Sequence, residues 1–183
     1  MKHIGTKTIE TPRLILRRFT QEDSRSVFEN WASDEEVTRY MAWPRHQTLD
    51  DTRKVLREWV ESYENDSFYE WAIVLKELGQ PIGSIEVLSC DDYVQKANLG
   101  YSIGKAFWGR GIMPEALKAV IDYLFDEVGV QRVEACHDAR NPNSGKVMRK
   151  CGMLHEGTMR RWAWTNAGIC DTCNYGILIE DRI

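Results

Sequence analysis

The stretch "AFWGRGIMPEAL", residues 106–117, joins a glycine-rich turn to the clearest helical pattern in the chain. Gly109 and Gly111 stand where the first backbone N–H groups of a helix have no intrahelical partner. Pro114 fits the first helical turn, where no N–H is needed. Downstream, apolar residues recur on one helical stripe that stops at Gly129: Met113, Ala116, Leu117, Val120, Ile121, Leu124, Phe125 and Val128. The pattern predicts a long helix that begins directly after the turn.

A helix start of this kind can bind an anion. Free N–H donors and the helix dipole attract negative charge, glycine lets a ligand come close to the backbone, and Arg110 adds a guanidinium that can bind phosphate through two hydrogen bonds. The two commonest nucleotide loops do not fit, because a dinucleotide fingerprint needs glycine at Pro114 and a P-loop needs Gly-Lys-Ser/Thr. A plain strand-to-helix turn without a ligand is the alternative.

Apolar periodicity and turn residues predict the elements on either side of this helix. We expect strands at 13–19, 68–75, 82–88, 97–103 and 132–137, helices after Asp23, at 49–63 and at 144–151, and a final hairpin that turns at 166–168. Because the long helix lies between two strands, the sheet contains at least one parallel crossover. The fold class is therefore α/β (α+β) with a mixed sheet.

Length and composition are those of one soluble globular domain. The chain has 183 residues, of which 43% are hydrophobic and 28% charged, and its formal net charge is -4. That charge argues against nonspecific nucleic-acid binding, which depends on an excess of Lys and Arg. The N-terminus has no apolar signal region, and no apolar run is long enough to span a bilayer, so we expect a cytoplasmic protein without a membrane partner.

Cysteine usage indicates reduced thiols and no metal site. Five cysteines form no disulfide framework. Cys170 and Cys173 form a C-x-x-C, but a structural zinc needs a second pair, and on a strand the two sulfurs would point to opposite faces. We therefore expect no metal.

Three segments in their order resemble a known family. "LGYSIGKAFWGRGIMPEAL" is followed after a strand by "ARNPNSGKVMRKCGMLHEG", and "TPRLILRRFTQED" lies near the N-terminus. Together they resemble the GNAT superfamily of acetyl-CoA-dependent N-acetyltransferases, most closely its RimJ/RimL-like branch. The resemblance covers nearly the whole chain and implies a single domain over residues 1–183, with its core at about 10–180. It also implies a central sheet of about seven strands, mostly antiparallel with one parallel splayed pair, flanked by about four helices.

The resemblance also implies where acetyl-CoA binds. The backbone N–H groups of residues 109–113 would hold the pyrophosphate, and the pantetheine arm would pair with the strand that ends at Ile103. The full set of cofactor-binding residues implied is Tyr101, Ile103, Trp108, Gly109, Arg110, Gly111, Ile112, Met113, Asn141, Ser144 and Lys146.

Acetyl transfer to an amine needs a donor for the developing oxyanion, a proton for the departing thiolate and an acceptor for the amine proton. A backbone N–H near Tyr101 is the candidate oxyanion donor, and Ser144 is implied at the thiolate, with a helix N-cap as its alternative role. Glu86 is our catalytic candidate for the amine proton. A solvent-mediated path and four other side chains remain alternatives: Asp91, His137, His155 and Asp171.

The expected acceptor is a primary amine, namely the α-amine of a protein or peptide N-terminus. An α-amine, with a pKa near 8, needs a weaker base than a lysine side chain does. Trp43 is the candidate substrate-binding residue, with plain packing as its alternative. Two other functions stay open: acetylation of a small molecule such as a polyamine, aminoglycoside or amino acid, and noncatalytic binding of coenzyme A by a regulatory module. We expect a monomer or a homodimer.

Overall fold

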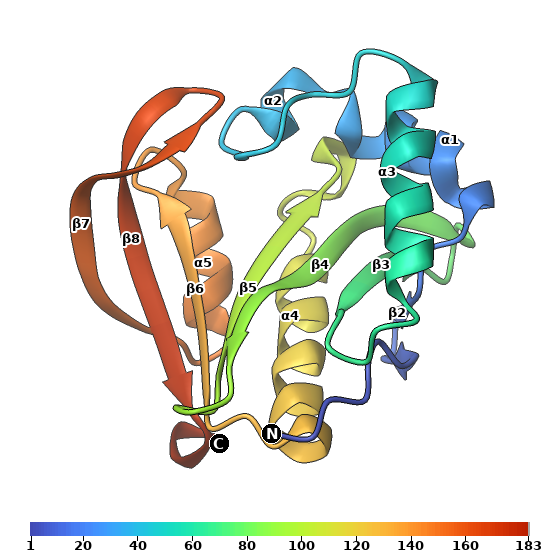
Figure 1. Cartoon of the computed structure of the whole chain (residues 1–183). Coiled ribbons are helices and arrows are strands. Elements are labelled where there is room, and N and C mark those ends of the chain that lie inside the picture. Colours follow the sequence, from blue (N-terminus) through green and yellow to red (C-terminus); the bar gives the residue numbers. More distant parts are fainter. Residues whose placement is uncertain (183) are drawn as a thin grey trace.

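One mixed β-sheet organises the computed structural model, which describes residues 1–182 (Figure 1). Its eight strands lie in the order β1-β2-β3-β4-β5-β6-β8-β7. They are β1 (Ile9–Glu10), β2 (Leu14–Arg17), β3 (Glu70–Leu75), β4 (Gln80–Asp91), β5 (Lys96–Ile103), β6 (Arg132–Asp138), β7 (Leu154–Thr165) and β8 (Gly168–Leu178). The mixed α/β fold expected from the sequence is confirmed, and its described part has eight strands instead of about seven because the short β1 joins the edge.

Strands β5 and β6 form the parallel pair, and they separate along their length. Their register runs from Lys96 opposite Arg132 to Leu99 opposite Ala135. Beyond these residues β5 continues to Ile103 and β6 to Asp138 without pairing to each other. Figure 1 shows the two strands diverging toward the end of the sheet that faces α2. This splay opens the sheet where the candidate site lies.

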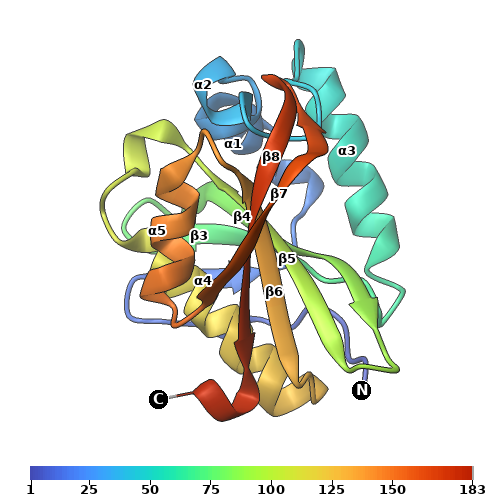
Figure 2. The same cartoon turned by 90° about the vertical axis from the view of Figure 1, so that its left-hand side faces the viewer.

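Helices cover both faces of the sheet (Figure 2). Helices α4 (Ile112–Tyr123) and α5 (Pro142–Lys150) lie on one face, and α3 (Leu49–Ser62) lies on the other together with the short α1 (Ser24–Val27). Alternate residues of a strand therefore enter different cores. Ile73 packs in the cluster that contains α4, whereas Ala72 and Val74 pack in the cluster that contains Leu56 of α3.

Local signals account for the helix boundaries. Thr48 and Asp51 form a capping box at the start of α3, as the sequence predicts. The long helix ends at Gly129, whose φ of 81° is left-handed. Helix α5 begins at Pro142 instead of Ser144, because proline is well suited to the first helical position. None of the described helices is long and apolar enough to cross a membrane.

Helix α2 (Glu35–Thr38) is a short element that apolar periodicity does not predict. It begins in the acidic run 33–37, where Asp34 caps it by accepting hydrogen bonds from Glu36 N and Val37 N. Four residues are too few for an apolar period to show. Helix α2 matters because it stands over the splay.

Candidate functional site

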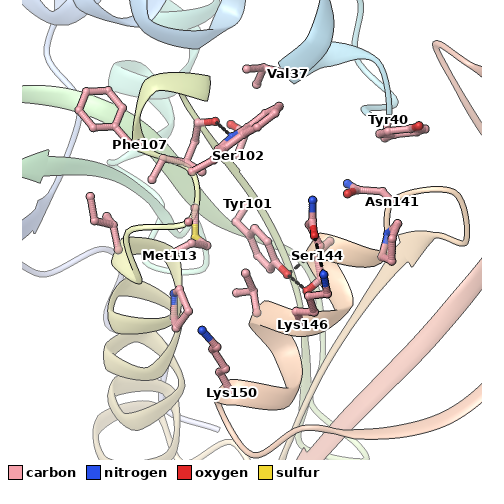
Figure 3. Close-up of a pocket in the computed structure, with 18 of the residues that line it drawn as sticks. Val37, Tyr40, Tyr101, Ser102, Phe107, Met113, Asn141, Ser144, Lys146 and Lys150 are labelled. Atoms are coloured by element: carbon pink, nitrogen blue, oxygen red, sulfur yellow. Dashed lines mark hydrogen bonds between the residues drawn. The ribbon is translucent and has the colours of Figure 1, made fainter.

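A cavity of about 480 Å³ lies at the splay, between the ends of α4 and α5 and beneath α2 (Figure 3). It is lined by β5, by the turn that leads into α4, by the start of α5 and by α2 with the residues after it. Most of the predicted cofactor-binding residues line it: Tyr101, Ile103, Trp108, Gly109, Gly111, Ile112, Met113, Asn141, Ser144 and Lys146. The predicted residues Arg110, Glu86 and Trp43 are not among the lining residues.

The turn before α4 has the geometry of an anion site. Gly109 and Gly111 have φ values of 74° and 71°, a left-handed region that favours glycine. The carbonyls of Arg110 and Gly111 both accept hydrogen bonds from the guanidinium of Arg13, at 2.9 Å each. With its carbonyls held by Arg13, the turn can present its N–H groups to a ligand. The Arg110 side chain itself lies over the ring of Phe107.

Arg13 is in turn held by α4. Its Nε donates to Glu115 Oε2 at 2.6 Å, and its backbone N donates to Glu115 Oε1 at 3.0 Å. Thr11 Oγ1 also donates to Glu115 Oε1, at 2.7 Å. Burial opposes ionisation of Glu115, but these hydrogen bonds and the charge of Arg13 outweigh it and lower its pKa. The segment "TPRL" therefore positions the turn, a role that its sequence alone does not reveal.

Tyr101 and Ser144 face each other across the cavity wall (Figure 3). The Tyr101 hydroxyl donates to the Ser144 carbonyl at 3.0 Å, and it lies 2.8 Å from Ser144 Oγ. Burial raises the pKa of Tyr101, so its hydroxyl stays protonated at neutral pH. Because α5 begins at Pro142, Ser144 is not a helix N-cap, and its hydroxyl is directed to Tyr101.

Glu86 lies on the face of the sheet turned toward α3, opposite Glu70 on β3 and Gly100 on β5. Burial raises its pKa, and a hydrogen bond from Glu70 opposes this rise. The other candidate proton acceptors do not line the cavity. His137 is buried, with Nδ1 2.8 Å from the Asp138 carbonyl, and Asp171 accepts a hydrogen bond from Arg161 N at 2.7 Å.

The β7-β8 hairpin is fastened to the segment after α2. Asn166 Nδ2 donates to the carbonyls of Thr38 and Trp43, both at 2.9 Å, and Asn166 N donates to the Met41 carbonyl at 3.0 Å. The hairpin thus supports, from outside the cavity, the segment after α2 that lines it. The Trp43 ring packs near His46 and against the core cluster under α3. Tyr40 and Met41, a few residues before Trp43, line the cavity, and no motif in the sequence marks them.

An ion pair between the exposed Arg140 and the buried Asp138 connects this hairpin to the start of α5. The Asp138 carboxylate is fully buried and accepts from Arg140 Nη2 at 2.6 Å and from Arg140 Nε at 2.9 Å. Thr165 Oγ1 donates to the same carboxylate at 3.2 Å, and Arg140 Nη1 donates to the Ala167 carbonyl at 2.9 Å. Arg140 also lines the cavity. The pair holds the loop before Asn141 against the hairpin.

Helix α2 adds one charged group to the cavity wall. Glu36 lines the cavity and forms an ion pair with Lys105, next to the turn before α4. The acidic run that contains Glu36 carries no site role in the sequence analysis. The signal was weak because a cluster of acidic residues is usually a solvated face.

Comparison with known proteins gives a consistent result. The acetyltransferase (GNAT) domain family matches residues 13–154. The uncharacterized N-acetyltransferase YoaA of Bacillus subtilis (strain 168) is 28% identical over 170 residues, which cover 93% of this chain and 96% of YoaA. The ribosomal-protein-serine acetyltransferase of Escherichia coli (strain K12) is 25% identical over 141 residues, or 76% of this chain and 78% of that protein.

A solved structure shares the fold. The ribosomal α-N-protein acetyltransferase RimL in complex with coenzyme A superposes with a TM-score of 0.85 at 18% identity, over 96% of this chain and 99% of that one. At this identity the likeness shows the fold alone. The family match, which spans most of the chain, and the N-acetyltransferase relatives decide the assignment. The chain belongs to the GNAT family of acetyltransferases and is an N-acetyltransferase that transfers an acetyl group to an amine.

Proposed function

We propose that the chain transfers the acetyl group of acetyl-CoA to the α-amine of a protein or peptide N-terminus. The observation that carries this proposal is one continuous cavity that runs from the glycine turn before α4, past the splayed end of β5, to α2. A cosubstrate with a phosphate group at one end and a thioester at the other fits such a path. The Escherichia coli relative, by its name an acetyltransferase of ribosomal-protein serine, supports a protein acceptor.

The residues of the cavity suggest how acetyl-CoA is held. The N–H groups of Gly109 to Met113 would bind the pyrophosphate, and Lys146 and Lys150, which line the same cavity, add positive charge. The backbone of β5 near Ile103 has no strand partner on the β6 side and can pair with the pantetheine amides. RimL, which shares this fold, binds coenzyme A in its solved structure.

The chemical step we propose is direct transfer. The amine lone pair forms the new C–N bond, a β5 backbone N–H near Tyr101 stabilises the carbonyl oxygen, and the C–S electron pair leaves with sulfur. The thiolate takes a proton from the hydroxyl pair of Ser144 and Tyr101, which regains one from solvent in the cavity, and the amine proton passes to Glu86. The products are an N-acetyl amine and coenzyme A as its free thiol.

An acceptor screen tests this function. Purified protein is mixed with acetyl-CoA and, separately, with N-terminal peptides, polyamines, aminoglycosides and amino acids, and mass spectrometry locates the acetyl group. Acetylation of a peptide α-amine with the highest kcat/KM is the expected result. A preference for a small molecule would replace the proposed acceptor class. Binding of acetyl-CoA without turnover across the panel would instead support a regulatory module.

Ser144→Ala is expected to lower kcat about tenfold while leaving the KM for acetyl-CoA within about threefold. General acids contribute roughly 10²–10⁴-fold, but a thiolate is a good leaving group and needs less help. Tyr101→Phe should have a similar effect, and the double variant should be no worse than either one because the two hydroxyls act together. Steady-state kinetics measures this. Fully additive losses would show that the hydroxyls act independently.

Arg13→Ala is expected to raise the KM for acetyl-CoA about tenfold with little change in kcat, because the loss of two hydrogen bonds frees the turn to move. Arg13→Lys should be nearly as impaired, since lysine lacks the planar fork that binds both carbonyls. Arg25→Ala, which removes an exposed helix ion pair with Glu29, is the control. Full rescue by lysine would show that charge alone matters.

A further inference from the structure

Two carboxyl groups, one buried and one half-buried, lie side by side in the centre of the sheet. Glu70 on β3 is directly opposite Glu86 on β4, and Glu86 is opposite Gly100 on β5. Both side chains are on the face turned toward α3, because Glu70 shares its face of β3 with Ala72 and Val74, which belong to the core under α3. Glu70 is 1% exposed, and its Oε1 is buried without a hydrogen-bond partner. A buried acid of this kind calls for a reason beyond packing.

Their position side by side in the sheet disfavours ionisation of both carboxyls at once. Burial and the neighbouring Glu86 carboxylate raise the pKa of Glu70 well above its usual range. Within residues 1–182 neither carboxyl forms an ion pair with a basic side chain, and the titratable group that faces Glu70 from the end of α3 is Tyr63, whose hydroxyl donates to the Glu70 carbonyl. Of the two carboxyls, Glu70 is the more deeply buried and is the one that favours the protonated form, as the donor toward Glu86.

A chain of hydroxyls connects this pair to the cavity. Ser84 pairs with Ala72, two residues from Glu70 on β3, so its side chain lies on the same face of the sheet as the Glu70 carboxyl and diagonal to it. Ser84 Oγ lies 3.3 Å from Ser102 Oγ, and both serines are buried. Ser102 lines the cavity. Neighbouring polar side chains therefore lead from the cavity through Ser102, Ser84 and Glu70 to Glu86, which is partly exposed and can return a proton to solvent.

Gly100 leaves room for the Glu86 carboxyl, the last group in this series of side chains. A Cβ at Gly100 would lie 3.3 Å from Glu86 Oε1 and 3.2 Å from Leu88 Cδ1. The Glu86 carboxyl thus occupies space that any other residue at Gly100 would narrow. Gly100 is also the first residue of β5 beyond the paired part of the β5-β6 ladder. The carboxyl pair consequently lies at the root of the splay, close to where the sheet opens.

We propose that Ser102, Ser84 and Glu70 form a proton relay that carries the proton of the acceptor amine from the cavity to Glu86. One proton enters at the Ser102 hydroxyl as that hydroxyl passes its own proton to Ser84. Ser84 in the same way protonates Glu70, and Glu70 passes its original proton to the Glu86 carboxylate. The relay ends with each hydroxyl and Glu70 unchanged and with Glu86 neutral. The proposal rests on the proposed function, because it supplies that reaction with its proton path.

The test compares two variants that interrupt the proposed relay with one that keeps it. Ser84→Ala and Glu70→Gln should each lower kcat/KM for an N-terminal peptide about tenfold near neutral pH, since neither alanine nor an amide can pass a proton along. Ser84→Thr keeps the hydroxyl and should stay within about threefold of wild type. The kinetic effect of D2O on kcat should be larger in wild type and Ser84→Thr than in Ser84→Ala.

A second readout does not depend on activity. When the pKa of a glutamate is higher in the folded protein than in the unfolded chain, the free energy of unfolding falls as pH rises from the unfolded pKa of about 4.3 toward the folded value. Glu70→Gln cannot ionise, so its free energy of unfolding should fall less than that of wild type between pH 5 and about pH 8. Infrared spectroscopy should also show a protonated carboxyl band at pH 7 that Glu70→Gln removes.

The outcomes separate the relay from the reaction it serves. An active wild type whose Ser84→Ala and Glu70→Gln variants keep full kcat/KM would overturn the relay and leave the acetyltransferase function intact. Absence of the carboxyl band at pH 7 would overturn it too, because Glu70 would then be ionised. A wild type that acetylates no amine, yet shows the band, would reject the proposed function while the protonated pair stands.

Discussion

Gly109→Asp is expected to weaken the binding of acetyl-CoA about 100-fold, a loss of about 2.7 kcal/mol at about 1.36 kcal/mol per tenfold change. The added carboxylate would stand in the turn whose N–H groups we assign to the pyrophosphate, and a like charge at such a contact costs several kcal/mol. A Cβ added at Gly109 meets no atom within 4 Å, so we expect the loss to come from charge and not from a clash.

The chain offers a matched control for this variant. Gly79, in the turn between β3 and β4, has a φ of 67° against 74° for Gly109, and a side chain there also meets no atom within 4 Å. Gly79→Asp therefore imposes the same left-handed strain away from the cavity and should leave the Kd for acetyl-CoA unchanged. Titration calorimetry compares the two. Equal affinity in both variants would place the pyrophosphate elsewhere.

The glycine turn could be predicted from the sequence because its signals are local. Two glycines with positive φ, a proline in the first turn and the apolar stripe of α4 all fall within one short segment. The roles of Asn141 and Ser144 follow from the resemblance of the segment that contains them to the GNAT superfamily, and both residues line the cavity. Ten of the predicted cofactor-binding residues accordingly lie together around the cavity.

The groups that support the site could not be predicted in the same way, because strand register and distant contacts create them. Glu70 and Glu86 become neighbours through the pairing of β3 with β4. Asn166 reaches Thr38 across 128 positions of the chain, and Arg13 reaches the Gly111 carbonyl across 98. No periodicity in the sequence encodes such distances, and a lone Asn or Arg has a solvated surface position as its default.

Asp138→Ala should destabilise the protein, with a loss of about 2 kcal/mol in the free energy of unfolding at pH 7, because the buried carboxylate accepts several charge-assisted hydrogen bonds. The Asp138 side chain is fully buried, and its removal leaves Arg140 without the carboxylate and Thr165 without an acceptor. The same change should also raise the KM for the acceptor, since Arg140 would no longer hold the hairpin at Ala167 in place.

An exposed ion pair provides the control for Asp138→Ala. Asp50→Ala removes the carboxylate of a surface pair with Arg53 and should leave stability almost unchanged.

Burial raises the pKa of Asp138, but the hydrogen bonds and charge of Arg140 outweigh burial and hold the pKa below its usual value. The stabilisation is therefore fully present above the unfolded pKa of about 3.9 and is lost as pH falls through the lower folded pKa. Urea unfolding should show the gap between wild type and Asp138→Ala closing only below about pH 4, and a gap that narrows with rising pH instead would contradict an ionised, paired Asp138.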